Sequence, residues 1–267
     1  MQLEQTAVWK ATRSTGLAWG RKLLNGLAQE MARHSTLGDK PIFATEDLPW
    51  VSHMERHWRA VRRELDEVLI DRDHIPYFDE ISPDQKHLTQ PRRWRSFFFY
   101  GYGYRSDENC ARCPQTARLL ERIPGMKTAF FSILAPRTHI LAHRGPYKGV
   151  LRYHLGLKVP EPELCRLRVD RELVRWHEGE SLLFDDTYEH EAWNDSNFER
   201  VVLFVDVLRP LPVLLALGNE ALVRAVGLSP LVQGGVRNFR RLSQHNETRA
   251  VCASRAVAHL ETQAGRG

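Results

Sequence analysis

Two histidines in the second half of the chain are the side chains best placed to hold a metal ion. His143 follows a short apolar segment and precedes the turn at Gly145-Pro146, and His190 lies in the sequence DDTYEHEAW. A metal that activates O2, such as non-haem iron(II), usually takes two histidines and a carboxylate on one face and keeps the other positions open. On a β scaffold such ligands come from strands that are distant in sequence, and this pair fits that arrangement.

An arginine at the start of the segment RVVLFVDVL is the second feature that points to a ligand. The segment Arg200–Leu208 is apolar on both faces, which is typical of a strand in the centre of a sheet. A guanidinium there would lose its water and would need an anion. The carboxylate of a ligand such as 2-oxoglutarate could bind it through two parallel hydrogen bonds. An ion pair with Asp185, Glu189 or Glu191 is the alternative.

The third feature is a pair of polar residues in an otherwise apolar segment. In Val150–Leu157, four apolar residues at alternate positions point to one face of an extended strand, and Arg152 and His154 point to the other. Because this segment directly follows the turn after His143, its polar face could point at the metal and bind the second carboxylate of 2-oxoglutarate. A strand with its polar face in solvent is the other interpretation.

Short apolar segments separated by turn residues occupy the second half of the chain. Breaks fall at prolines, glycines and asparagines, and no helix-length segment interrupts the series. Many short strands at this spacing indicate an antiparallel sandwich or barrel, and disfavour a parallel sheet. The predicted strands are Trp94–Tyr102, Met126–Leu134, Thr138–Ala142, Val150–Val159, Cys165–Val169, Glu180–Phe184, Glu189–Trp193 and Arg200–Leu208.

Helical patterns flank these strands. Apolar residues recur every three or four positions over Trp50–Leu69, which predicts one helix packed by a single face. A shorter helix is predicted at Pro114–Arg122, a loop at 71–93, and helical structure again at 209–243. The last segment carries five arginines and one glutamate. It could lie peripherally on an anionic membrane or pack on the barrel as an ordinary helix.

Composition and charge argue against a nucleic-acid-binding protein and against a membrane-spanning one. The net charge of +5 is too mild to argue for nucleic acid. No apolar run approaches the roughly 18 residues that cross a bilayer, and the N-terminus has no apolar signal core, so we expect a cytoplasmic protein. Cys110 and Cys113 form a CxxC motif without a second CxxC. We interpret them as reduced thiols near a helix start, and not as a zinc or redox site.

Four segments between Trp94 and Pro210 together resemble the aspartyl/asparaginyl β-hydroxylase family, which includes bacterial lipid A hydroxylases. They are CPQT, HRGPYKGVLRYHLGL, WHEGESLLFDDTYEHEAWND and RVVLFVDVLRP. The resemblance implies a mainly β, double-stranded β-helix (jelly-roll) domain at 94–210, with a helical lead-in at 1–93 and a helical tail at 211–267. It also implies hydroxylation that depends on iron(II), 2-oxoglutarate and O2. The implied iron ligands are His143 and His190, and the implied 2-oxoglutarate contacts are Ser132, Arg152, His154 and Arg200.

The position two residues after the first histidine bears on the number of iron ligands. It holds Gly145, which has no side chain to bind a metal. We therefore expect iron on two histidines, with Asp186 fixing a nearby water, and direct ligation by Asp186 as the alternative. In an extended strand, Asp186, Tyr188 and His190 would share one face.

The same position bears on the substrate. By the resemblance, glycine there belongs to the aspartyl branch and aspartate to the lipid A branch. Gly145 thus favours an aspartyl or asparaginyl substrate, as a small molecule, in a peptide or on a carrier protein. The flanking PYKGVLRYHLGL favours a lipid A acyl chain. A jelly-roll binding module without catalysis is the alternative outside enzymes.

Overall fold

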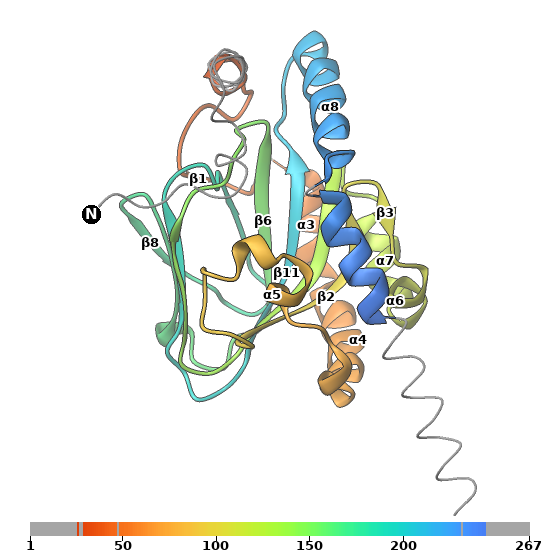
Figure 1. Cartoon of the computed structure of the whole chain (residues 1–267). Helices are drawn as coiled ribbons and strands as arrows, with labels where there is room; N and C mark the ends of the chain where they lie inside the picture. Colours follow the sequence, from red (N-terminus) through yellow and green to blue (C-terminus); the bar gives the residue numbers. More distant parts are fainter. Residues whose placement is uncertain (1–25, 27–28, 47, 231, 244–267) are drawn as a thin grey trace, which may run out of the picture.

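Two antiparallel sheets form the body of the protein in a computed structural model that describes residues 26, 29–46, 48–230 and 232–243 (Figure 1). One sheet has the strand order β1-β9-β6-β11-β4-β2-β3 and the other the order β5-β10-β7-β8. The strands are β1 (Ile42–Phe43), β2 (Trp94–Gly101), β3 (Tyr104–Arg105), β4 (Met126–Leu134), β5 (Thr138–His143), β6 (Val150–Lys158), β7 (Cys165–Val169), β8 (Glu172–Arg175), β9 (Ser181–Phe184), β10 (His190–Asn194) and β11 (Arg200–Leu208).

The path of the chain between the sheets defines the jelly roll. From β4 to β11 the chain passes repeatedly from one sheet to the other, with β4, β6, β9 and β11 in the large sheet and β5, β7, β8 and β10 in the small one. Each pairing of neighbouring strands is antiparallel. This topology confirms the predicted double-stranded β-helix.

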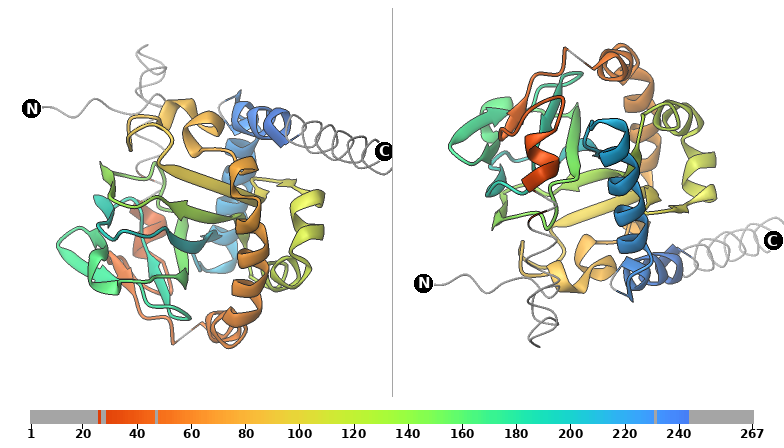
Figure 2. Two further views of the ribbon diagram at one scale, coloured as in Figure 1. Left: turned by 90° about the horizontal axis from the view of Figure 1, so that it is seen from below. Right: turned by 90° about the horizontal axis from the view of Figure 1, so that it is seen from above.

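Helices flank the sheets, as predicted. They are α3 (Pro49–Arg56), α4 (Trp58–Ile70), α5 (Phe78–Ile81), α6 (Asp107–Arg112), α7 (Pro114–Leu120) and α8 (Val213–Gly227), with further helical residues at 29–33 and 232–243. Helices α3, α4, α6 and α7 cover the outer face of the large sheet, where their apolar residues share one core with it (Figure 2). Residues 1–25 and 244–267 of the predicted flanking regions lie outside the described residues.

The central strand β11 explains why its sequence is apolar on both faces. Its odd-numbered residues from Val201 to Val207 pack against the helix-covered core, and Val202 and Phe204 pack between the two sheets. Strand β6 divides in the same way, with Leu151 to Leu157 at odd positions on the helix side. Even-numbered residues of both strands therefore face the interior between the sheets, which is where the polar side chains Arg152, His154 and Arg200 are directed.

One predicted helix is two helices in the structure. The predicted segment Trp50–Leu69 breaks at His57, between α3 and α4. The Nδ1 atom of His57 lies 2.8 Å from the carbonyl oxygen of His53, and its backbone N–H donates to Met54 instead. A side chain that takes the i−4 carbonyl interrupts the helical ladder, and this accounts for the break. The apolar periodicity continues across it.

Short elements were missed by the sequence reasoning. Strands β1, β3 and β8 have two to four residues each, and α5 lies inside the predicted loop 71–93. Strand β8 is mostly exposed and lacks apolar alternation, so nothing in its sequence separates it from a loop.

The two cysteines of the CxxC motif lie near the start of α7, with Cys113 at its N-cap. Cys110 and Cys113 are free, buried thiols in the core under the helices, and burial raises the pKa of the Cys113 thiol to about 12. The buried carboxylate of Glu64 on α4 accepts hydrogen bonds from the backbone N–H groups of Gln115 and Thr116, both at 2.8 Å. These are first-turn amides of α7, so Glu64 supplies the acceptor that this helix start lacks.

Within the described part of the chain, no single helix is long and apolar enough to cross a membrane. The one pair that reaches that length and composition together, Val213–Gly227 and Val232–Ser243, is bent by 55°.

Candidate active site

The two histidines predicted to bind metal are partners across neighbouring strands. His143 at the end of β5 pairs with His190 at the start of β10, and their ring centroids lie 4.1 Å apart. Each Nδ1 lies near a backbone carbonyl oxygen two residues earlier, at 2.7 Å from that of Leu141 and at 3.0 Å from that of Tyr188. An Nδ1–H donated to a carbonyl leaves the lone pair on Nε2, which is the form in which histidine binds a metal.

Burial favours the same neutral form of both rings. It lowers the pKa of His143 to about 4 and that of His190 below its ordinary value. Neutral imidazoles this close do not repel each other, and they do not have to lose a proton before binding a cation.

An extra residue in β5 turns His143 toward the interior. His190 pairs with His143, but Ala192 pairs with Ile140, so three steps along β5 match two steps along β10. Without this bulge, alternation would put His143 on the same face as His139, which stacks on Trp193 at 4.9 Å outside the barrel. The bulge therefore puts the two histidines on one side of the small sheet.

The segment before His190 is a turn, which corrects one prediction. Residues 186–188 do not form an extended strand, so Asp186, Tyr188 and His190 do not share a strand face. Asp185 anchors this turn: its carboxylate accepts from the backbone N–H of Thr187 at 2.9 Å and forms a fully buried ion pair with Arg209. Sequence reasoning missed Arg209, whose only signal is a cation at the end of a buried strand.

Asp186 still lies at the site, because its carboxylate fills the space beside Gly145. The backbone N–H of Gly145 donates to the carbonyl oxygen of Asp186 at 2.6 Å. A Cβ on Gly145 would come within 2.2 Å of the Asp186 carboxylate. The absence of a side chain at position 145 is therefore what admits the aspartate.

Arg152 is at the site but is engaged by two carboxylates. Its guanidinium lies 2.9 Å from Asp186 and 3.1 Å from Asp206, which is its register partner on β11. Burial raises the pKa of Asp186 to about 6, against the lowering effect of Arg152. Asp206 was missed by the sequence reasoning, although an acid inside RVVLFVDVL is itself a sign of a buried partner.

Arg200 has no counter-ion among the described residues. It is 2% exposed, and no ion pair or hydrogen bond joins its guanidinium to a side chain or carbonyl there. The alternative ion pairs are wrong, because Asp185 binds Arg209 while Glu189 and Glu191 bind Arg168. Burial lowers the pKa of Arg200 to about 10, which leaves it charged at neutral pH.

Unpaired polar groups gather around Arg200. The ring of Trp176 lies 4.3 Å from the Arg200 guanidinium and 5.8 Å from the ring of His154. Trp176 Nε1 and both ring nitrogens of His154 are buried without a hydrogen-bond partner among the described residues. Buried polar groups without partners are rare, and several together indicate a ligand that supplies the missing acceptors and donors. Trp176 was not predicted as a site residue.

Ser132 lies on the same interior face but already has one partner. Its hydroxyl accepts a hydrogen bond from Trp94 Nε1 at 2.9 Å, and its hydroxyl proton remains to donate elsewhere. Among the described residues, no group of three or more His, Cys, Asp or Glu side chains is arranged to hold a metal. The histidine pair offers two nitrogen donors.

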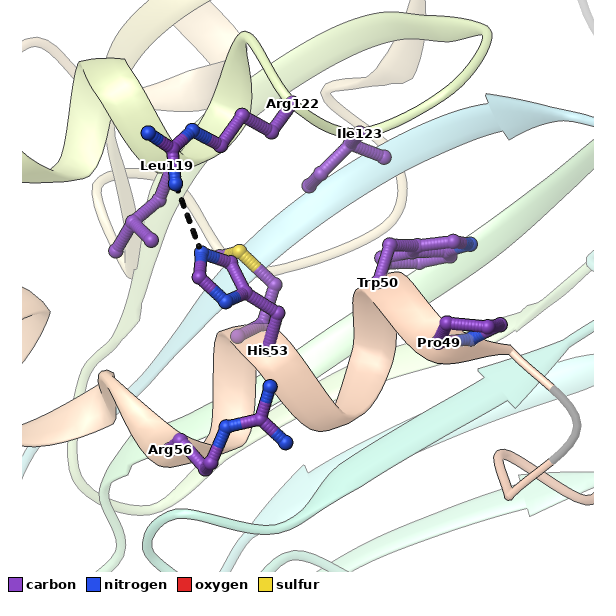
Figure 3. Close-up of a pocket in the computed structure, with 8 residues that line it drawn as sticks. Pro49, Trp50, His53, Arg56, Leu119, Arg122 and Ile123 are labelled. Carbon is purple, nitrogen blue, oxygen red and sulfur yellow. Dashed lines mark hydrogen bonds between the residues drawn. The ribbon is translucent and has the colours of Figure 1, made fainter.

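A pocket lies on the outer, helix-covered side of the large sheet. The pocket, of about 360 Å³, opens between α3 and α7, with Trp50, His53 and Arg122 at its rim (Figure 3). Its residues belong to helices and loops outside the barrel, so it is separate from the histidine pair.

The sequence matches a known protein family and proteins that belong to it. The profile of the family described as aspartyl/asparaginyl beta-hydroxylase matches residues 55–210. The ornithine lipid ester-linked acyl 2-hydroxylase of Rhizobium tropici is 43% identical over 209 residues, which cover 78% of this chain and 74% of that protein. The human aspartyl/asparaginyl beta-hydroxylase is 36% identical over 165 residues, covering 60% of this chain and 21% of the human one. This chain thus spans about a fifth of its human relative.

Among solved structures, a cupin domain of an XRE family transcriptional regulator from Enterobacter cloacae aligns with a TM-score of 0.31 at 13% identity, over 43% of this chain and 97% of that domain. From the extent of the sequence matches, this chain belongs to the aspartyl/asparaginyl β-hydroxylase family and is a hydroxylase.

Proposed function

We propose that the protein is an iron(II)- and 2-oxoglutarate-dependent dioxygenase that hydroxylates an acyl chain of a polar lipid. The observation that carries the cofactor proposal is the pairing of two neutral histidines with a separate, uncompensated buried arginine. The residues fit both groups: His143 and His190 would hold iron through Nε2, and Arg200 would hold a ligand carboxylate.

The buried polar residues around Arg200 would bind 2-oxoglutarate. Arg200 would bind the far carboxylate of 2-oxoglutarate, with the Ser132 hydroxyl and the unpaired nitrogens of His154 and Trp176 beside it. When bound, iron and 2-oxoglutarate supply the oxidising chemistry, in which 2-oxoglutarate and O2 give succinate and CO2 while one oxygen atom enters a substrate C–H bond. The aromatic wall, which includes Phe130, Phe184 and Phe204, excludes water from this space.

Asp186 and Arg152 would act beside the metal as positioning residues. The ion pair of 2.9 Å holds the Asp186 carboxylate next to Gly145, on the loop that directly follows His143. A carboxylate there can accept a hydrogen bond from a metal-bound water without binding the metal itself. This role keeps two protein ligands on the iron, as the sequence predicts.

The Rhizobium tropici relative supports the lipid substrate. Its name describes hydroxylation of a lipid-bound acyl chain, and its similarity extends over 209 residues, beyond the 165 shared with the human protein. An aspartyl or asparaginyl substrate is the second candidate, because the human relative is named for it and Gly145 matches that branch.

The test uses purified protein with iron(II), 2-oxoglutarate and one of two acceptors: ornithine lipid in detergent, or aspartate-containing peptides. We expect succinate and a lipid product that has gained one oxygen atom. His143→Ala or His190→Ala should abolish iron binding and turnover, while His139→Ala, on the outer face of the same strand, should keep both. Hydroxylated peptide with unchanged lipid would overturn the substrate proposal, and full activity in His143→Ala would overturn the metal site.

A further inference from the structure

Aliphatic side chains are exposed along one face at the start of helix α8. Leu214 is 84% exposed, Val213 75% and Leu217 64%. Two more large exposed apolar residues, Val226 and Leu228, follow at its end. Half of the ten exposed large apolar residues in the described part of the chain thus belong to this helix or its last turn. Clustering of this kind indicates a surface that is covered in use.

The middle of helix α8 contacts the loop that follows His143. Asn219 on α8 donates to the carbonyl oxygen of Gly149 at 2.7 Å, and its own side-chain oxygen accepts from the Tyr147 hydroxyl at 2.8 Å. Both partners lie on the connection between His143 and β6. Seen from above, α8 and the helical residues 29–33 lie at the same end of the molecule (Figure 2).

A cation without a carboxylate partner in the described residues lies on the same loop. Arg144 directly follows His143, is exposed, and donates to the carbonyl oxygen of Thr187 at 3.3 Å. In the segment 209–243 that contains α8, Arg209 is buried against Asp185, which leaves four arginines against one glutamate that pairs with Lys127 and Arg224. Apolar side chains next to positive charge match the chemistry of an anionic lipid surface.

We propose that Val213, Leu214 and Leu217, together with Arg144 on the loop that α8 contacts, form a docking surface for an anionic bilayer. The inference rests on the proposed lipid substrate, and adds how the enzyme reaches it. Docked by this surface, the protein presents the loop after His143 to the membrane that contains the acyl chain. A second copy of the chain is a poorer occupant, because a stable dimer buries about 800 Å² and 20–30 residues on each partner. Three aliphatic side chains on a convex helix fall well short of that.

The experiment measures co-sedimentation of the full chain with vesicles of phosphatidylcholine and phosphatidylglycerol, roughly two to one, and of phosphatidylcholine alone. We expect binding to the anionic vesicles that falls with salt. The double variant Leu214→Asp/Leu217→Asp should bind at least about tenfold more weakly, because it removes two exposed leucines that docking would bury in the bilayer. Acidic residues suit the first turns of a helix, so α8 should stay folded. Ile70→Asp is the matched control, since Ile70 is 86% exposed on α4 and should bind as the wild type does.

The vesicle and sedimentation results distinguish a bilayer from a second copy of the chain as the partner of this surface. Equal vesicle binding by all three proteins, or none by the wild type, overturns the proposal. A wild type that sediments as a dimer, and a double variant that sediments as a monomer without any vesicle binding in either, assigns the surface to a second copy. Failure of the docking proposal can be distinguished from failure of the proposed function. If the protein hydroxylates lipid in detergent but does not bind vesicles, only the docking proposal is overturned. Vesicle binding without lipid hydroxylation overturns the substrate.

Discussion

Replacing Gly145 with alanine perturbs the site by a single methyl group. The new Cβ would lie 2.2 Å from the Asp186 carboxylate, which is more than 1 Å inside ordinary contact at about 3.5 Å. The backbones cannot separate easily, because the Gly145 N–H donates to the Asp186 carbonyl oxygen at 2.6 Å. The carboxylate must therefore move, and the 2.9 Å ion pair with Arg152 is lost.

The loss of folding free energy in Gly145→Ala lies between two limits. If Asp186 becomes protonated in the variant, its pKa of about 6 sets the free-energy cost of protonation at about 1.4 kcal/mol at pH 7. If it stays charged without its partner, the cost approaches about 3 kcal/mol, the low end for a broken buried pair, because Arg152 keeps Asp206. We expect Tm to fall by roughly 3–12 °C.

Thermal unfolding of four variants checks this reasoning. Gly101→Ala is the control, because a Cβ there meets no atom within 4 Å. Asp186→Ala alone should lower the Tm, and adding Gly145→Ala to it should cost little more, since the carboxylate that the methyl group meets is gone. Gly145→Ala that unfolds at the temperature of the Gly101→Ala control would refute the account, as would additive effects in the double variant.

Three further outcomes are expected. Arg200→Lys should weaken 2-oxoglutarate binding by about 1.5–3 kcal/mol in a calorimetric titration, because an ammonium cannot form the two parallel hydrogen bonds; unchanged affinity would move the carboxylate site elsewhere. Deletion of Leu141 should remove the bulge but keep His143 facing inward and retain iron(II) binding, because two steps from Ile140 to His143 then match the two steps from Ala192 to His190; loss of iron(II) binding in a folded deletion variant, with binding kept in Leu141→Ala, would contradict this account of the bulge. Glu64→Gln should lower the stability by about 1 kcal/mol in denaturant unfolding, because α7 loses its anionic cap, while exposed Glu67→Gln should not; equal effects would mean that the cap is unimportant.

Much of the barrel could be predicted from sequence because its strands follow a period of two. The observed bounds of β4, β7 and β11 are the predicted ones, and the alternation in β6 correctly separated Arg152 and His154 from the helix-covered face. Central strands bury both faces or alternate strictly, so their patterns are strong.

What the sequence could not provide depends on pairing across the barrel. The bulge in β5 is defined by how β5 pairs with β10, and no local sequence pattern around Leu141 predicts it. The engagement of Arg152 by Asp186 and Asp206 likewise joins residues that are distant in sequence. Sequence patterns identify which face a residue points to, but not which opposite charge it meets there.

The charges along the interior also bear on how the proposed cofactors bind. Arg152 and Arg200 are matched in number by Asp186 and Asp206, and both histidines are neutral, so these side chains sum to zero at neutral pH. The pairing is uneven, because both carboxylates lie on Arg152 and none on Arg200. The histidine end therefore carries the negative excess that favours a divalent cation, and the Arg200 end the positive charge that favours a carboxylate. Iron(II) and the dianion of 2-oxoglutarate together add no net charge, whereas either alone adds two charges to a space of low dielectric. Joint binding is then favoured over either alone, and by linkage each cofactor should tighten the other.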